Sequence, residues 1–73
     1  MKIDLEDFHT GWFGVHVGLT SSEIQLLISR LQTLQQKRGH FHLRRSDFAG
    51  SGGVADVEFY WADDDTPKNM QIE

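Results

Sequence analysis

Apolar and polar residues recur with two different periods along this chain. Four segments alternate at every second position, which is typical of strands that bury one face: residues 2–6, 12–19, 40–44 and 56–61. In the middle of the chain the period changes, and apolar residues recur every three or four positions from Ile24 to Leu34. That spacing gives a helix one apolar stripe. The pattern therefore predicts two strands, one helix and two further strands.

Local signals place the helix at about residues 21–38. Thr20 and Glu23 have the spacing of a capping box, in which each residue satisfies a backbone N–H group of the other. Leu19 and Ile24 stand at the two positions of a hydrophobic staple around this cap. The start of the helix is therefore specified by several independent features.

Glycines mark the turns between the elements. Gly39 is the expected left-handed residue after the helix, and the preceding Lys37 and Arg38 suit the negative end of the helix dipole. Residues 9–11 are expected to form a three-residue hairpin loop. Residues 46–53 have the composition of a flexible loop and do not match a phosphate-binding P-loop.

These elements predict an α+β fold with β-β-α-β-β order. One helix packs on one face of a four-stranded, mostly antiparallel sheet. If the strands are numbered along the chain, the sheet order 2-1-3-4 keeps all neighbours antiparallel, and we favour it. Residues 1–62 are expected to form a single domain, followed by a flexible acidic tail at 63–73.

Matching the apolar faces fixes the expected register of both hairpins. The inward pairs are Phe41 with Phe59, Leu43 with Val57, Ile3 with Val17 and Leu5 with Val15. The outward pairs are His42 with Glu58, Arg44 with Asp56, His40 with Tyr60, Asp4 with His16 and Phe8 with Trp12. Opposed charges and aromatic rings across strands stabilise a sheet. Cross-strand pairing is thus a sufficient structural explanation for the cations of residues 39–45.

Composition narrows the choice of functions. The chain has 73 residues, no cysteine and a net charge of −4. No acidic residue lies between Glu23 and Asp47, whereas the last third is acidic. An acidic total argues against general phosphate binding and suits a basic partner. No membrane span or signal peptide is recognised, so we expect a cytoplasmic protein.

The outward histidines leave several chemistries open. His40 and His42 stand on one side of a strand, and with Glu58 or His16 they would offer zinc ligands or a small-ligand site. A His–Glu pair also suits a general base, but no convincing nucleophile accompanies it. Outward aromatic side chains would stack on RNA bases, although the acidic residues repel phosphates. We assign no catalytic residue, cofactor or metal ligand and expect no enzyme activity.

Protein binding is the function that we favour for the outward face. Aromatic and arginine side chains are enriched in interface cores. The expected partner-binding residues are Trp12, His16, His40, His42, Arg44, Asp56, Glu58 and Tyr60. A thin core and an uncovered sheet also make a homodimer plausible.

The middle of the chain resembles a family of small bacterial immunity proteins, which neutralise toxins of polymorphic or contact-dependent systems. The resemblance covers residues 22–60: a Leu-rich helix, Gly39, the strand His-Phe-His-Leu at 40–43, a glycine-rich loop and a hydrophobic strand. Where that family often has Trp-Gly-Gly, this chain has residues 48–53 without tryptophan. The resemblance implies a cytoplasmic, non-enzymatic inhibitor that binds a cognate toxin domain.

Overall fold

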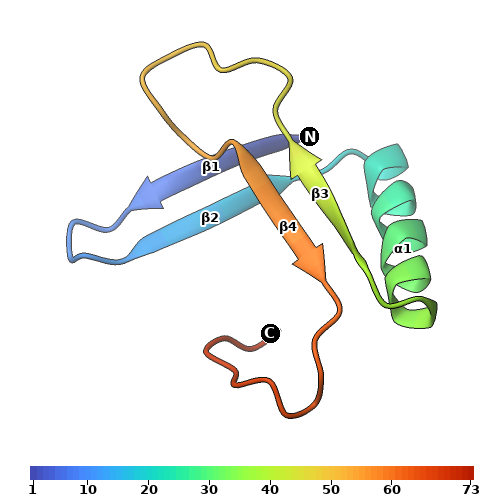
Figure 1. Cartoon of the computed structure of the whole chain (residues 1–73). Coiled ribbons are helices and arrows are strands. Elements are labelled where there is room, and N and C mark those ends of the chain that lie inside the picture. The colour runs from blue at the N-terminus through green and yellow to red at the C-terminus, as the bar shows by residue number, and fades with distance from the viewer.

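Each strand pairs with its neighbour along the chain and with no other strand. The computed structural model describes residues 1–73 (Figure 1). Its elements are β1 (Lys2–Asp7), β2 (Phe13–Gly18), α1 (Ser21–Gln36), β3 (His40–Arg44) and β4 (Asp56–Tyr60). They form two separate two-stranded antiparallel sheets, β1-β2 and β3-β4. The prediction of one four-stranded sheet with order 2-1-3-4 is therefore wrong.

The single sheet was predicted wrongly because an alternating pattern does not specify how one hairpin pairs with another. Period-two alternation determines which face of a strand is apolar, and a short turn brings consecutive strands together. Neither property selects a neighbour for the outer edge of a hairpin. Here the two hairpins approach only at one corner, where residues 1–4 lie near residues 43–47 and 54–56. Elsewhere they diverge (Figure 1).

The first hairpin, residues 2–18, is called the arm below. Its register is the predicted one, with Ile3 opposite Val17 and Leu5 opposite Val15. The Phe8 N–H group donates to the Trp12 carbonyl oxygen at 3.1 Å, which closes the predicted three-residue loop. Gly11 has a positive φ of 93°, as a loop of this kind requires.

The helix begins as predicted and ends early. The capping box is present: Thr20 Oγ1 accepts from the Glu23 N–H group, and the Thr20 N–H group donates to Glu23 Oε1 at 3.0 Å. However, the chain turns extended at Lys37, whose φ is −126° and ψ 114°. The prediction of a left-handed Gly39 after a helix to residue 38 is wrong. The Arg38 guanidinium instead lies 4.2 Å from the ring centre of Trp61, a cation–π contact that the extended backbone permits.

The β3-β4 hairpin also has the predicted register. Phe41 lies opposite Phe59 with their rings stacked, 5.0 Å between centroids and 8° between planes. Leu43 lies opposite Val57. These four side chains are half-buried. The small interior of the molecule lies between the apolar face of this hairpin and α1, which packs on β3.

That interior is small. No residue is fully buried, and the chain exposes 6775 Å². A compact folded monomer of this size exposes about 4,600 Å². The radius of gyration is 14.3 Å, against about 11 Å for a compact chain of this length. The molecule is an open structure with much apolar surface in contact with solvent.

The chain after β4 contains no helix or strand. One turn is closed where the Thr66 N–H group donates to the Asp63 carbonyl oxygen at 3.0 Å. The side chains of Met70 and Ile72 are exposed. The flexibility of residues 63–73 stays a prediction.

Candidate functional site

Four charged or protonatable side chains form a connected group on the outward face of the β3-β4 hairpin. They are called the polar cluster: His42, Arg44, Asp56 and Glu58. The Asp56 carboxylate accepts from His42 Nδ1 at 3.0 Å and from Arg44 Nε at 3.1 Å. On its other side, His42 Nε2 lies 3.8 Å from Glu58 Oε1. One imidazole therefore bridges two carboxylates.

The hairpin register builds this cluster. Arg44 is the direct cross-strand neighbour of Asp56, and His42 is that of Glu58. The His42–Asp56 hydrogen bond runs diagonally, within reach because side chains on one face stand close together across an antiparallel pair. The predicted cross-strand pairs are therefore present, but His42 lies closer to Asp56 than to Glu58, its predicted partner.

The centre of the cluster is shielded more than its rim. The His42 side chain is 20% exposed, whereas the carboxylate side chains on either side are about half exposed. The His40 ring packs edge-on against that of His42, with 5.2 Å between ring centroids. His42 is therefore fixed in position by contacts on three sides, while the Glu58 carboxylate accepts no hydrogen bond within the chain.

The contacts of Asp56 keep it ionised. Partial desolvation raises the pKa of Asp56, but hydrogen bonds from His42 and Arg44, aided by the charges of these groups, outweigh it. The net result is a pKa below the usual aspartate value. The cluster therefore combines two carboxylates with one guanidinium and one imidazole.

The other predicted site residues are divided between the two hairpins. His40 and Tyr60 are cross-strand neighbours beside the polar cluster. Trp12 and His16 lie on the arm, so the predicted single surface carrying all eight residues is absent. The Trp12 side chain is 76% exposed next to the arm turn. His16 Nε2 donates to Glu6 Oε1 at 2.6 Å rather than to its direct neighbour Asp4.

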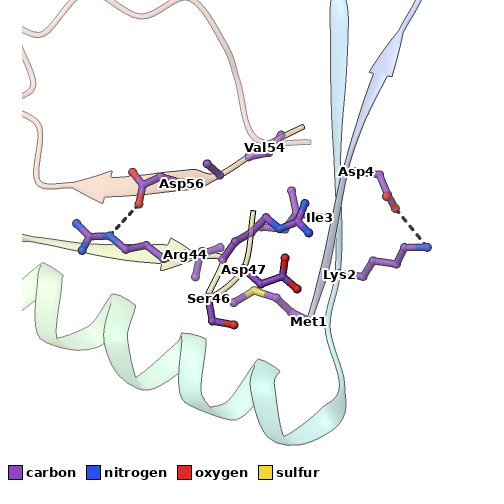
Figure 2. A pocket seen from close by; sticks show the side chains of 12 residues that line it. Met1, Lys2, Ile3, Asp4, Arg44, Ser46, Asp47, Val54 and Asp56 are labelled. Atoms are coloured by element: carbon purple, nitrogen blue, oxygen red, sulfur yellow. Dashed lines mark hydrogen bonds and ion pairs between the residues drawn. The ribbon is translucent and has the colours of Figure 1, made fainter. Parts of the chain in front are cut away.

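A cleft of about 450 Å³ lies at the corner between the hairpins (Figure 2). Its walls are residues 1–4, 43–47 and 54–56. Three basic and three acidic residues line it, and two pairs of them are in contact, Arg44 with Asp56 and Lys2 Nζ with Asp4 at 3.9 Å. Sequence reasoning missed this cleft because it depends on how the arm approaches the second hairpin, for which the sequence gives no local signal.

The arrangement supplies no set of metal ligands. Zinc is held by three or four protein ligands converging on one point. No group of three or more His, Asp or Glu side chains converges in this way. His16, one of the ligands considered from the sequence, is on the arm, whereas His40 and His42 are on β3.

Comparison of the chain with protein-family models, curated proteins and solved structures finds no match. The resemblance to immunity proteins stays a prediction for that reason. The one helix, α1, lacks both the length and the apolar character needed to cross a bilayer.

Proposed function

We propose that this chain is a non-enzymatic protein-binding module, an immunity protein that binds and neutralises a cognate toxin domain in the bacterial cytoplasm. The observation that supports the proposal is the polar cluster. Its imidazole and guanidinium hold Asp56 in one orientation and leave Glu58 available to a partner. Charged groups that are already oriented lose little conformational freedom on binding.

The charge of the chain indicates the class of partner. The net charge is −4, and β4 with the residues after it carries five carboxylates in ten positions, at 56, 58, 63, 64 and 65. An acidic surface accelerates association with a basic protein. A toxin domain that cleaves nucleic acid has a basic active site, because its substrate is a polyanion. We therefore expect the cognate toxin to be a basic nuclease domain.

The proposed contact surface is centred on the outward face of the β3-β4 hairpin. Tyr60 and His40 extend the polar cluster at one end, and their rings give the surface apolar area. Trp12 and His16 on the arm would form a second, separate contact. Aromatic side chains beside charged groups are the usual composition of binding hot spots.

The proposal expects a basic toxin domain to be encoded beside the gene for this chain, and the test is binding to that domain. We expect the purified chain to bind that domain and suppress its toxicity on co-expression, with affinity falling as salt rises. Glu58→Gln is expected to weaken binding at least tenfold, whereas Asp4→Asn, on the arm, is the control and should change it less than threefold. The proposal fails if the domain does not bind, or if its binding is insensitive to both salt and Glu58→Gln.

We also propose that the chain forms a homodimer. The supporting observation is its surface, which exceeds that of a compact monomer by roughly 2,000 Å². Burying part of this excess against a second copy lowers the free energy of the folded state, because large apolar residues such as Leu5, Phe13 and Val15 are about half exposed. Light scattering coupled to size-exclusion chromatography tests this proposal. A monomer mass at 100 µM would overturn it.

A further inference from the structure

One face of the arm is apolar and uncovered. Leu5, Phe13, Val15 and Val17 project on the same side as Ile3, and the exposed fractions of these four residues lie between 45% and 56%. Neither the helix nor the second hairpin packs along β1 or β2. The arm therefore presents a row of branched and aromatic side chains to solvent, with Asp7 opposite Phe13 at the end near the turn. These five residues are called the arm face.

The helix has a matching uncovered flank. At 100° per residue, its apolar stripe spans about 120°. Leu27 and Leu34 stand at one edge of the stripe and are half-buried, on the helix that packs against β3. Ile24, Ile28 and Leu31, at the centre and the other edge, are 41–44% exposed. These three residues are called the helix flank.

The arm does not cover the helix flank of its own chain because the connection between them is short and fixed. Two residues, Leu19 and Thr20, join β2 to α1, and the capping box holds Thr20. The amino group of Met1 is bonded to the Glu23 carboxylate, so β1 is fastened to the same turn of the helix. With both strands held there, the arm extends away from α1 (Figure 1).

We propose that two copies exchange arms, so that the arm face of each lies on the helix flank of the other. The inference rests on the proposed homodimer and specifies its interface. Each chain carries both an arm face and a helix flank. In a dimer with a two-fold axis, the arm face of each copy therefore covers the helix flank of the other, and neither surface stays exposed. The excess of roughly 2,000 Å² on each chain is the upper limit of the area that this contact can hide, and it exceeds the roughly 800 Å² per partner of a standard interface.

Charges beside the two surfaces favour the same arrangement. Of the three carboxylates of β1, Asp7 stands on the same side as the arm face, opposite Phe13, whereas Asp4 and Glu6 stand on the other side. The helix and the residue after it carry Arg30 and Lys37 with no acidic residue beyond Glu23. An arm seated on the helix of a second copy thus brings the Asp7 carboxylate towards a helix whose only acidic residue is Glu23, whereas two arm faces stacked on each other bring two Asp7 carboxylates together. Complementary fields select the first arrangement.

Substitution on the two sides of one strand tests the surface. Leu5→Asn places a polar amide on the arm face, and Asp4→Asn places the same side chain on the opposite face of β1. We expect Leu5→Asn to raise the dimer dissociation constant at least tenfold in analytical ultracentrifugation and Asp4→Asn to change it less than threefold. Equal effects of the two substitutions would overturn the inference.

Cross-linking tests the exchange itself, with substitutions at two positions that are about half exposed, Val15 at 55% and Ile28 at 43%. The chain has no cysteine, so Val15→Cys and Ile28→Cys each introduce a single thiol. One variant is labelled with ¹⁵N, the two are mixed and oxidised, and the disulfide-linked species are identified by mass. We expect the mixed species joining position 15 of one copy to position 28 of the other. Asp4→Cys mixed with Ser29→Cys, off both surfaces, is the control and should give no such species.

The outcomes separate this inference from the proposals on which it rests. Disulfides joining 15 to 15 or 28 to 28 overturn the exchange while leaving the homodimer. A double variant, Val15→Cys with Ile28→Cys, that closes within a monomer overturns it as well, because the arm then covers its own helix. A monomer in every experiment overturns both. Toxin binding is measured on the other hairpin through Glu58→Gln and is unaffected by any of these results.

Discussion

The His42 imidazole and the Asp56 carboxylate lie 3.0 Å apart, diagonally across the β3-β4 pair. Arg44 approaches the same carboxylate from the direct cross-strand position, with Nε 3.1 Å from Oδ1. Two donors on one acceptor make Asp56 the most constrained carboxylate of the second hairpin. Four predictions follow from this contact, the helix cap and the arm.

The first prediction concerns the pKa of Asp56. Its hydrogen bonds from His42 and Arg44 hold this pKa below the usual value despite partial desolvation. A lowered folded-state pKa contributes stability above the unfolded value of about 3.9, and this contribution is lost as the pH falls through the folded value. Arg44→Gln removes one donor, so we expect the pKa of Asp56 to rise. Carboxyl ¹³C chemical shifts measure it. Arg45→Gln is the control and should leave it unchanged.

The second prediction concerns Glu23 at the start of α1. The hydrogen bond from the amino group of Met1, followed by those from the Thr20 N–H and hydroxyl groups, lowers the pKa of Glu23 from 4.5 to about 2. Its stabilising effect is therefore complete above pH 4.5 and disappears as the pH falls towards 2. Acetylating the amino group removes the first contact, so the pKa should rise but stay below 4.5 because the Thr20 bonds remain. An unchanged carboxyl titration after acetylation would contradict the contact.

The third prediction concerns the helix cap. Thr20→Ala removes the hydroxyl that accepts from the Glu23 N–H group, so we expect the free energy of unfolding to fall by about 1 kcal/mol. Urea denaturation at a fixed protein concentration measures the loss. Thr10→Ala, in the arm turn, removes the same hydroxyl from a position without a cap and should cost less than about 0.5 kcal/mol. Equal losses at the two positions would show that Thr20 has no capping role.

The fourth prediction concerns two glycines of β2. A Cβ atom on Gly14 would lie 2.8 Å from Phe8 Cζ, whereas one on Gly18 would lie 3.7 Å from the nearest atom, the Lys2 carbonyl oxygen. Gly18→Ala is therefore expected to stabilise the fold by about 0.5 kcal/mol through reduced chain entropy. Gly14→Ala should gain less and displace the Phe8 ring, which proton chemical shifts of that ring will reveal. Unshifted Phe8 resonances in Gly14→Ala would contradict the packing.

The features that were predicted correctly from the sequence are those determined within one hairpin or at one helix end. Both hairpin registers, the loop at residues 9–11 and the capping box depend on residues close in the chain, and all are present in the structure. The predicted end of the helix was wrong, and the extended backbone there places Arg38 against Trp61, a residue far away in the sequence. Local capping rules contain no information on such a contact.

The alternation of apolar and polar residues could not predict how the two hairpins are arranged relative to each other. Alternation gave the correct apolar faces, Phe41 with Phe59 on one hairpin and Leu5 with Val15 on the other, but not what covers them. The polar cluster was predictable because its members share one hairpin. The surface that was expected to join Trp12 to the polar cluster is absent, because that surface required all four strands to form one sheet.

If the proposed homodimer forms, a molecule without a fully buried residue gains part of its stability from association with a second copy. When folding is completed by association, the folded fraction rises with the amount of protein present. Chains made in small numbers would remain accessible to cellular proteases, whereas chains above a threshold concentration would protect one another. In that case the open arm would make the lifetime of each copy in the cell depend on the number of other copies synthesised.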